Sequence, residues 1–265
     1  MARYKVFIEY EGTRYSGWQV QQNARTIQGE LLNALKKVLK TNEVELYGSG
    51  RTDAGVHALM QTAHLEVQTM LAPEIIRMKV NDELPADINI LEVEKVPAGF
   101  HARHDAISRS YLYQISRRRT AFGKRYVWWV RDALDVARMR EASTLFVGMK
   151  DLRSFTDNDP EEVSTRILVD AIDIAESGSL ILIRVQGSHF LWKLARRVVG
   201  VLAEVGRGKI SMDDVRGFLR EKSDAPARLT APPSGLFLEF VTYDKNSSPR
   251  PLQPIMNIAT MRVRQ

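Results

Sequence analysis

The sequence predicts a mixed α+β protein built on antiparallel sheets. Two observations support this class: segments of alternating polar and apolar residues, typical of half-buried strands, and intervening segments with apolar residues at helical spacing. The chain of 265 residues is long enough for two domains of ordinary size. Its 44% hydrophobic and 26% charged residues are typical of a globular protein.

The first hundred residues contain six expected elements in the order β-α-β-β-α-β. Residues 4–10 alternate as a strand, with Tyr4, Val6, Ile8 and Tyr10 on one face. Thr26 can cap a helix, and Pro73 can open a second helix that ends near Leu84. Further strands are expected at residues 43–47, 61–67 and 88–96. This order is that of the ferredoxin-like split βαβ arrangement.

The second half has a similar pattern with additional elements. Strands are expected at residues 110–116, 165–175, 179–186 and 236–243. Helices are expected at residues 135–146, 190–205 and 211–220. We therefore expect two ferredoxin-like domains, residues 1–104 and 105–245, that flank a basic central cleft. Residues 246–265, with three prolines and little periodicity, are expected to form a C-terminal tail that is mobile or packs on a partner.

Positive charge is concentrated in one segment. The chain contains 38 Lys and Arg against 32 Asp and Glu, a net charge of +6. Residues 101–131 hold eight of these cations and a single acid, Asp105, together with six aromatic residues. Cations beside aromatic rings suit phosphates and stacked bases, so the segment indicates nucleic-acid binding. A solvated basic surface over ordinary core aromatics is the alternative.

Composition also limits the chemistry and the location. The chain has no cysteine, which excludes disulfides, thiolate catalysis and cysteine-ligated metals. No metal site is predicted, because among the five histidines only His101 and His104 have a spacing found in zinc sites. We expect those two to face a ligand or to support the fold. The first ten residues alternate instead of forming an apolar run, and no segment reaches the roughly 18 apolar residues of a membrane span. We expect a cytoplasmic protein without a membrane partner.

Residues 48–57, Gly-Ser-Gly-Arg-Thr-Asp-Ala-Gly-Val-His, are the densest local signal for a functional site. Glycines allow sharp turns and close approach to a ligand, so Asp53 can face a cleft from a rigid turn. A purely structural turn, in which Asp53 bonds nearby backbone amides, is the alternative. The segment lacks the Gly-Lys-Ser/Thr of a phosphate-binding P-loop.

Six segments in order resemble the tRNA pseudouridine synthase A family. They are residues 10–19, 50–57, 100–103 (Phe-His-Ala-Arg), 109–113 (Arg-Ser-Tyr-Leu-Tyr), 190–200 and 231–236 (Ala-Pro-Pro-Ser-Gly-Leu). Single short motifs arise by chance, whereas six in the same order rarely do. The departures are small: Leu194-Ala195 stands where the family more commonly has Met-Val, and residues 68–71 lack an Arg that some relatives carry.

The resemblance implies a pseudouridine synthase fold and a cofactor-independent isomerisation. The family breaks the N1–C1′ bond of uridine in tRNA, turns the base over and forms a C5–C1′ bond, so neither a redox cofactor nor a metal is required. It acts on the anticodon stem-loop, commonly at positions 38, 39 and 40, as a homodimer that binds tRNA.

The resemblance also implies roles for individual residues. Asp53 is the nucleophile, Arg196 pairs with it, and Tyr111 stacks on the flipped uracil and assists proton transfer. Arg51 holds the flipped nucleotide, and Leu236 forms an apolar pocket wall. The residues expected to contact RNA are Phe100, His101, Ala102, Arg103, His104, Ser164, Thr165 and Arg166. Attack on the base, attack at C1′ and removal of a sugar proton toward a glycal are all open.

Two other functional classes are compatible with parts of the sequence. A non-catalytic RNA-binding protein of two split βαβ units would explain the charge and the aromatics, but not Asp53 in a glycine-rich turn. A hydrolase with paired carboxylates would need a second acid in a comparable setting, and none stands out.

Overall fold

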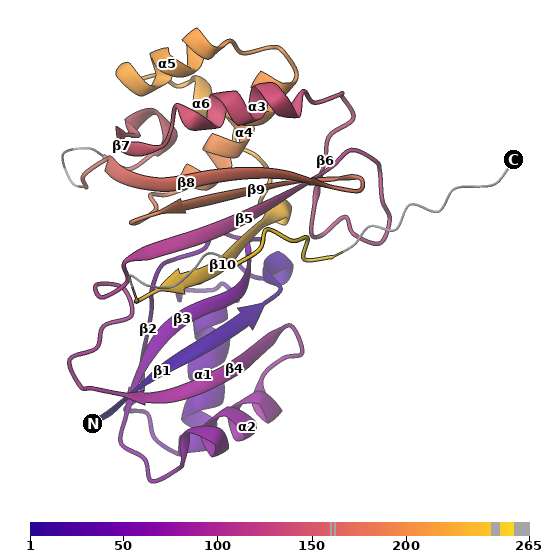
Figure 1. Ribbon diagram of the computed structural model, residues 1–265. Helices are drawn as coiled ribbons and strands as arrows, with labels where there is room; N and C mark the ends of the chain where they lie inside the picture. Colours follow the sequence, from indigo (N-terminus) through magenta and orange to yellow (C-terminus); the bar gives the residue numbers. More distant parts are fainter. Residues whose placement is uncertain (160, 162, 245–249, 257–265) are drawn as a thin grey trace, which may run out of the picture. The chain divides into compact units, whose positions relative to one another are not determined.

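The computed structural model describes residues 1–159, 161, 163–244 and 250–256, and has a mixed α+β fold, as predicted (Figure 1). The chain divides into two units. The first comprises Met1–Arg109 and Phe237–Ser247, and the second comprises Ser110–Leu236 and Ser248–Gln265. The described part contains six α-helices, none of them long and apolar enough to cross a membrane.

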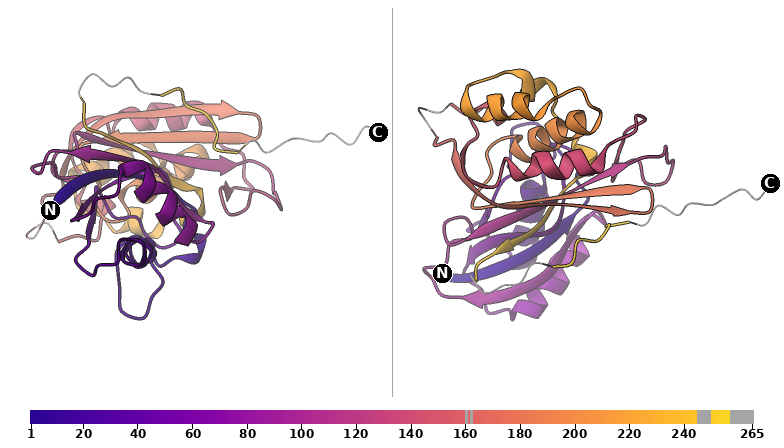
Figure 2. Two further views of the ribbon diagram at one scale, coloured as in Figure 1. Left: turned by 90° about the horizontal axis from the view of Figure 1, so that it is seen from below. Right: turned by 45° about the horizontal axis from the view of Figure 1, so that its top comes forward.

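The first unit is an antiparallel sheet with two helices on one face (Figures 1 and 2). Its strands are β1 (Ala2–Tyr10), β2 (Glu45–Gly48), β3 (His57–Val67) and β4 (Ile88–Val96). Its helices are α1 (Ile27–Leu39) and α2 (Pro73–Glu83). The central order is β4-β1-β3; β2 pairs with the second half of β3, while the start of β3 pairs in parallel with β10 (Leu236–Thr242).

Local sequence explains why these elements form. The side chains of Tyr4, Val6, Ile8 and Tyr10 are all buried, so the alternation in β1 faces the core as predicted. The Thr26 hydroxyl accepts a hydrogen bond from the Gly29 N–H and caps α1. Pro73 occupies the first turn of α2, where its missing N–H costs nothing. Strand β3 begins at His57 instead of residue 61, because His57 and Ala58 pair with β10 and Ala58 also pairs with Tyr10 of β1.

In the second unit four strands pair in the order β5-β9-β8-β7, and the helices of this unit cover one face of them (Figure 1). The strands are β5 (Ser108–Ser116), β6 (Trp128–Trp129), β7 (Gly148–Asp151), β8 (Arg166–Ser177) and β9 (Leu180–Gly187). The helices are α3 (Val136–Thr144), α4 (Leu194–Gly206), α5 (Met212–Arg220) and α6 (Ala225–Arg228). Strands β8 and β9 match the strands predicted at residues 165–175 and 179–186, and they form a hairpin that turns at Gly178 with a φ of 58°.

The start of one predicted helix is wrong. Residues 190–193 are not helical, and α4 begins at Leu194. Lys193 has left-handed backbone angles, and the Trp192 N–H donates to the Asn158 side chain. Because a right-handed helix cannot pass through a left-handed residue, the Phe190–Lys193 segment forms a turn before α4.

The predicted tail lies partly outside the described residues. Of residues 246–265, only 250–256 are described. In that stretch the Ile255 N–H donates to the Gln114 side chain, and Leu252 and Ile255 pack against a buried apolar cluster of the second unit. Arg184 donates to the carbonyl oxygens of residues 250 and 251. Residues 250–256 therefore pack on the second unit of their own chain. The predicted domain limits, residues 1–104 and 105–245, stay a prediction.

Close packing at Gly200 gives a test of the second unit. A Cβ added there would lie 1.7 Å from the carbonyl oxygen of Leu229, which is backbone and cannot rotate away. We expect Gly200→Ala to lower the free energy of unfolding by about 3 kcal/mol. Gly217→Ala in α5 is the matched control, since nothing lies within 4 Å of its added Cβ; there we expect a gain of about 0.5–1 kcal/mol. Urea titration measures both, and equal effects at the two sites would contradict this packing argument.

Candidate functional site

Asp53 lies in the loop between β2 and β3, and this loop is held by the segment that follows β1. The Trp18 N–H donates to the Thr52 carbonyl at 3.0 Å, and the Gly55 N–H donates to the Tyr15 carbonyl at 3.3 Å. The Tyr10 hydroxyl and the Thr52 hydroxyl share a buried hydrogen bond of 2.8 Å. Thr52 and Gly55, on either side of Asp53, are thus anchored by hydrogen bonds. Asp53 itself is half-buried, and Arg51 is exposed.

Two glycines allow this close approach. A Cβ on Gly12 would lie 1.9 Å from the Val56 carbonyl oxygen. Gly17 has a φ of 93°, and a Cβ there would lie 2.6 Å from the Thr52 carbonyl oxygen. The glycines of residues 10–19 are therefore required by the backbone of the Asp53 loop, which explains physically why these two motifs occur together.

Arg109 is a supporting residue that the sequence analysis did not single out. Its guanidinium is buried and donates to the carbonyl oxygens of Ser49, Arg103 and Ala106, at 3.1, 2.6 and 3.1 Å. Ser49 begins the Asp53 loop, and Arg103 belongs to the predicted RNA-contact segment. One side chain therefore ties the two segments together within the first unit.

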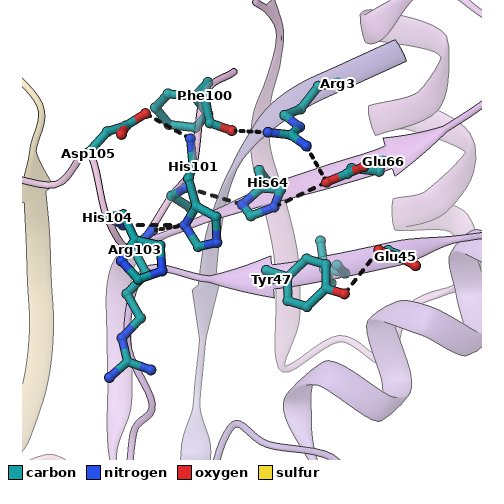
Figure 3. Close-up of polar contacts among 12 residues, drawn as sticks. Arg3, Glu45, Tyr47, His64, Glu66, Phe100, His101, Arg103, His104 and Asp105 are labelled. Atoms are coloured by element: carbon teal, nitrogen blue, oxygen red, sulfur yellow. Dashed lines mark hydrogen bonds and ion pairs between the residues drawn. The ribbon is translucent and has the colours of Figure 1, made fainter. Parts of the chain in front are cut away.

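The predicted RNA-contact residues 100–104 form a turn after β4 (Figure 3). Arg103 and His104 are exposed, Phe100 and His101 are half-buried, and Ala102 is completely buried. The Phe100 ring packs against the Tyr243 ring with centroids 5.2 Å apart. Of the predicted RNA-contact residues 100–104, only Arg103 and His104 are therefore fully exposed to solvent. Phe100 and Ala102 pack the turn against the rest of the unit.

Tyr111, Arg196 and Leu236 belong to the second unit. Tyr111 is on β5, 7% exposed, with its ring 4.5 Å from that of Phe190. Arg196 is half-buried in the first turn of α4, and its Nε donates to the Ala231 carbonyl at 2.8 Å. The Ala231 N–H returns a bond to the Arg196 carbonyl at 3.1 Å. Leu236 is buried at the start of β10.

Tyr113 joins the three motifs of this unit. Its hydroxyl donates to the Pro232 carbonyl at 2.8 Å, and a Cβ on Gly235 would lie 2.7 Å from its ring. Burial raises the pKa of the Tyr113 phenol well above its ordinary value, and the Arg196 charge opposes that shift. Tyr111 and Tyr113 are two residues apart on one strand and therefore share a face. Three of the motifs meet around them: residues 109–113, 190–200 and 231–236.

Further predicted residues lie elsewhere in the second unit. Ser164 and Arg166 are exposed, but Thr165 is buried and its hydroxyl donates to Asp151 at 2.7 Å. The loop after β5 carries an exposed cluster of cations at Arg117, Arg119, Lys124 and Arg125. Its aromatic residues include Phe122, which is 95% exposed, and Trp129, which lies under the Arg119 guanidinium. These cations and the two aromatic rings are thus exposed on the second unit, and whether they bind nucleic acid stays a prediction.

Comparisons with known proteins identify the family. A family model described as tRNA pseudouridine synthase matches residues 6–105 and 142–244, so the chain belongs to the tRNA pseudouridine synthase family, whose members are isomerases that convert uridine to pseudouridine. The tRNA pseudouridine synthase A of Rhodopseudomonas palustris (strain BisA53) is 40% identical over 247 residues, covering 92% of this chain and 100% of the relative. That of Geotalea uraniireducens (strain Rf4) is 40% identical over 245 residues, with the same coverage.

More distant similarities were also found. The tRNA pseudouridine synthase A 2 of Clostridium tetani (strain Massachusetts / E88) is 38% identical over 241 residues, covering 89% of this chain and 97% of the relative. A solved structure of a Cbf5–Nop10–Gar1 complex aligns with a TM-score of 0.33 and 13% identity over 75% of this chain and 54% of that chain, and it plays no part in the assignment.

The position of Arg109 makes a testable prediction about the first unit. Lysine is a compact cation and cannot reach three carbonyls at once, so we expect Arg109→Lys to lower the free energy of unfolding by about 2–3 kcal/mol. Exposed Arg131 is the control, and Arg131→Lys should stay within about 0.5 kcal/mol of wild type. Denaturant midpoints at constant m-value measure the difference. A neutral Arg109→Lys substitution would refute the bridging role.

Proposed function

We propose that this protein isomerises uridine to pseudouridine in the tRNA anticodon stem-loop, at positions 38, 39 and 40, with Asp53 as nucleophile and the target base flipped out. The observation that carries the proposal is the Asp53 loop, which is anchored on both sides of a half-buried carboxylate in a chain of this family. A uridine within a helical stem must leave the stack before a carboxylate can reach it.

The reaction needs no other reactant, because uridine and pseudouridine are isomers. The N1–C1′ bond breaks, the uracil turns, and a C5–C1′ bond forms; the C5 proton leaves to solvent and N1 gains a proton. In the proposal, the Asp53 carboxylate starts this sequence, Arg196 pairs with it, and Tyr111 stacks on the uracil and moves the C5 proton. No metal or redox cofactor takes part.

The remaining residues of the proposal bind the substrate. Arg51 holds the flipped nucleotide and Leu236 contributes an apolar wall. Phosphates and sugars are contacted by residues 100–104 and by Ser164, Thr165 and Arg166. Recognition by shape and phosphate suits an enzyme that acts on several neighbouring uridines. We further propose two ferredoxin-like domains, residues 1–104 and 105–245, around a basic cleft, and a cytoplasmic homodimer.

Two features favour an enzyme over a protein that only binds RNA. Phosphate binding requires exposed cations, and the loop after β5 alone would supply them. Phosphate binding does not require a carboxylate in a loop that is anchored to the segment after β1. Nor does it require the close backbone contact between that loop and Gly12 and Gly17. Such anchoring fixes the orientation of a side chain, and a fixed orientation is required of a group that reacts with a substrate.

The decisive experiment compares wild type with Asp53→Asn. Release of tritium from [5-³H]uridine-labelled tRNA measures the C5 chemistry directly. We expect release by wild type and a loss of at least about 10³-fold in Asp53→Asn, because the amide is not a nucleophile. The variant should bind tRNA with wild-type affinity. Release by Asp53→Asn at the wild-type rate would exclude the assigned role, and no release by wild type from a full tRNA panel would exclude the function.

The exposed Arg103 provides a test of phosphate contact. We expect Arg103→Ala to reduce the slope of log Kd against log salt concentration by about 0.7–0.9, the release of one counterion. Arg216→Ala is the control, because Arg216 is also exposed but lies on α5, where it pairs with Asp213. Filter binding of tRNA at several salt concentrations gives the slopes. Identical slopes for Arg103→Ala and wild type would remove Arg103 from the interface.

A further inference from the structure

The turn at residues 100–105 is fixed by side chains instead of secondary structure (Figure 3). The Phe100 carbonyl accepts a bond of 2.7 Å from Arg3 on β1. The Ala102 carbonyl accepts a bond of 2.6 Å from the Tyr243 hydroxyl, beyond the end of β10. The Arg103 carbonyl accepts a bond of 2.6 Å from Arg109. Three separate parts of the first unit therefore hold the carbonyl groups of this one turn.

The N–H groups of the turn are held by two histidines. The Ala102 N–H donates to Nδ1 of His64, on β3, at 3.1 Å. The N–H groups of Arg103 and His104 donate to Nδ1 of His101, at 3.1 and 3.3 Å. The His101 N–H donates to the Asp105 carboxylate at 2.8 Å.

These bonds determine the protonation state of both rings. A backbone N–H can only donate, so the nitrogen that accepts its bond carries no proton. His64 and His101 must therefore be neutral, with the proton on Nε2. In His64 this Nε2–H lies 3.6 Å from the Glu66 carboxylate, which also pairs with Arg3. Since Nδ1 of each ring is occupied, neither ring offers that atom to a metal.

The surroundings favour the neutral forms. Burial first, then the neighbouring His101 and Arg3, lowers the pKa of His64 to about 4, against the opposing charges of Glu66 and Asp105. Burial, followed by His104, also lowers the pKa of His101. Tyr47 on β2 faces the pair from the remaining side, its ring 5.1 Å from His64, and its hydroxyl is engaged by Glu45.

The sign of the pH effect follows from the lowered values. The unfolded chain binds a proton to histidine near 6.5, whereas folded His64 binds one only near 4. The bonds of the turn therefore contribute their full stability above about pH 6.5 and lose it as the pH falls through about 4.

We propose that neutral His64 is a positioning residue for RNA binding: it accepts the N–H of buried Ala102, whose carbonyl is held by Tyr243, and thereby presents Arg103 and His104 to tRNA. The proposal rests on the proposed function, since it assumes that these two exposed side chains meet the substrate. Ala102 is completely buried, so its unpaired N–H could not turn to water if His64 lost its acceptor. His64 itself is 1% exposed and acts only through the turn.

A matched pair of substitutions tests this role. His64→Gln keeps a side-chain acceptor for the Ala102 N–H, whereas His64→Leu has a similar size and no acceptor. In the tritium-release assay we expect His64→Leu to raise KM for tRNA about tenfold with kcat within about twofold, and His64→Gln to keep KM within about threefold of wild type. A KM for His64→Leu equal to that of wild type or of His64→Gln, or a loss confined to kcat, overturns the proposal.

Two further measurements keep the test decisive. Tyr243→Phe removes the hydrogen bond to the Ala102 carbonyl and should raise KM by about threefold even if His64→Leu does not fold. An unchanged KM for Tyr243→Phe counts against the proposal. Histidine ¹⁵N spectra of wild type, assigned by comparison with His64→Gln, should show an unprotonated Nδ1 in His64 at pH values down to about 5. Titration of His64 near its ordinary value also overturns the proposal.

These measurements distinguish failure of the positioning role of His64 from failure of the proposed function. Tritium release by wild type with an unaltered KM in the variants defeats the positioning role alone. Absence of release by wild type defeats the proposed function, and the positioning role with it, whatever the ¹⁵N spectra show.

Discussion

The position of Asp53 depends on a close approach of two backbone segments. Gly12 and Gly17 let the chain after β1 come within contact of the Thr52 and Val56 carbonyls, at distances that no Cβ would permit. Through that contact the loop receives hydrogen bonds from Trp18 and Tyr10 and loses the freedom of an ordinary surface turn. The segment that holds the loop continues directly from β1, which is paired on both sides, with β4 and β3. A side chain on a loop is usually held less precisely than one on a strand, and this contact restricts the loop that carries Asp53.

Irregular segments elsewhere in the first unit are stabilised by buried and half-buried polar side chains. Arg109, His64 and Tyr243 each bind backbone groups that have no partner in a helix or strand. A buried peptide group left without a partner is costly, so these side chains are needed wherever the chain leaves regular structure inside the unit. The second unit uses the same solution around Tyr113 and Arg196, whose polar atoms bind the carbonyls of residues 231 and 232. In both units the sequence motifs that resemble the family are therefore partners in backbone hydrogen bonding as well as candidates for chemistry.

The sequence predicted the regular elements well, and the parts that depend on distant contacts poorly. Strand β1 and helix α1 follow from periodicity and from Thr26, because those signals are local. The start of α4 was wrong because the left-handed backbone of Lys193 leaves no trace in composition. The short elements β6, β7 and α6 contain too few residues to show a period. For the candidate site, the glycine-rich pattern of residues 48–57 drew attention to Asp53, whereas its role and the other site residues came from resemblance. Arg109 was grouped with the surface cations, since nothing in the order of residues reveals that it is buried against three carbonyls.

The contrast between Arg109 and the exposed cations shows why local charge predicts an interface only in part. The segment 101–131 is rich in cations, but they divide into different classes. Arg109 neutralises carbonyl dipoles in the interior, and Arg117 pairs with Glu176. Arg103 and Lys124 are exposed, and only exposed cations can exchange counterions for phosphates. The number of basic residues in this segment therefore overstates how many are available to a polyanion. Under the proposed function, the rigidity with which Arg103 is held links tRNA binding to His64 and Tyr243, which support the turn at residues 100–105.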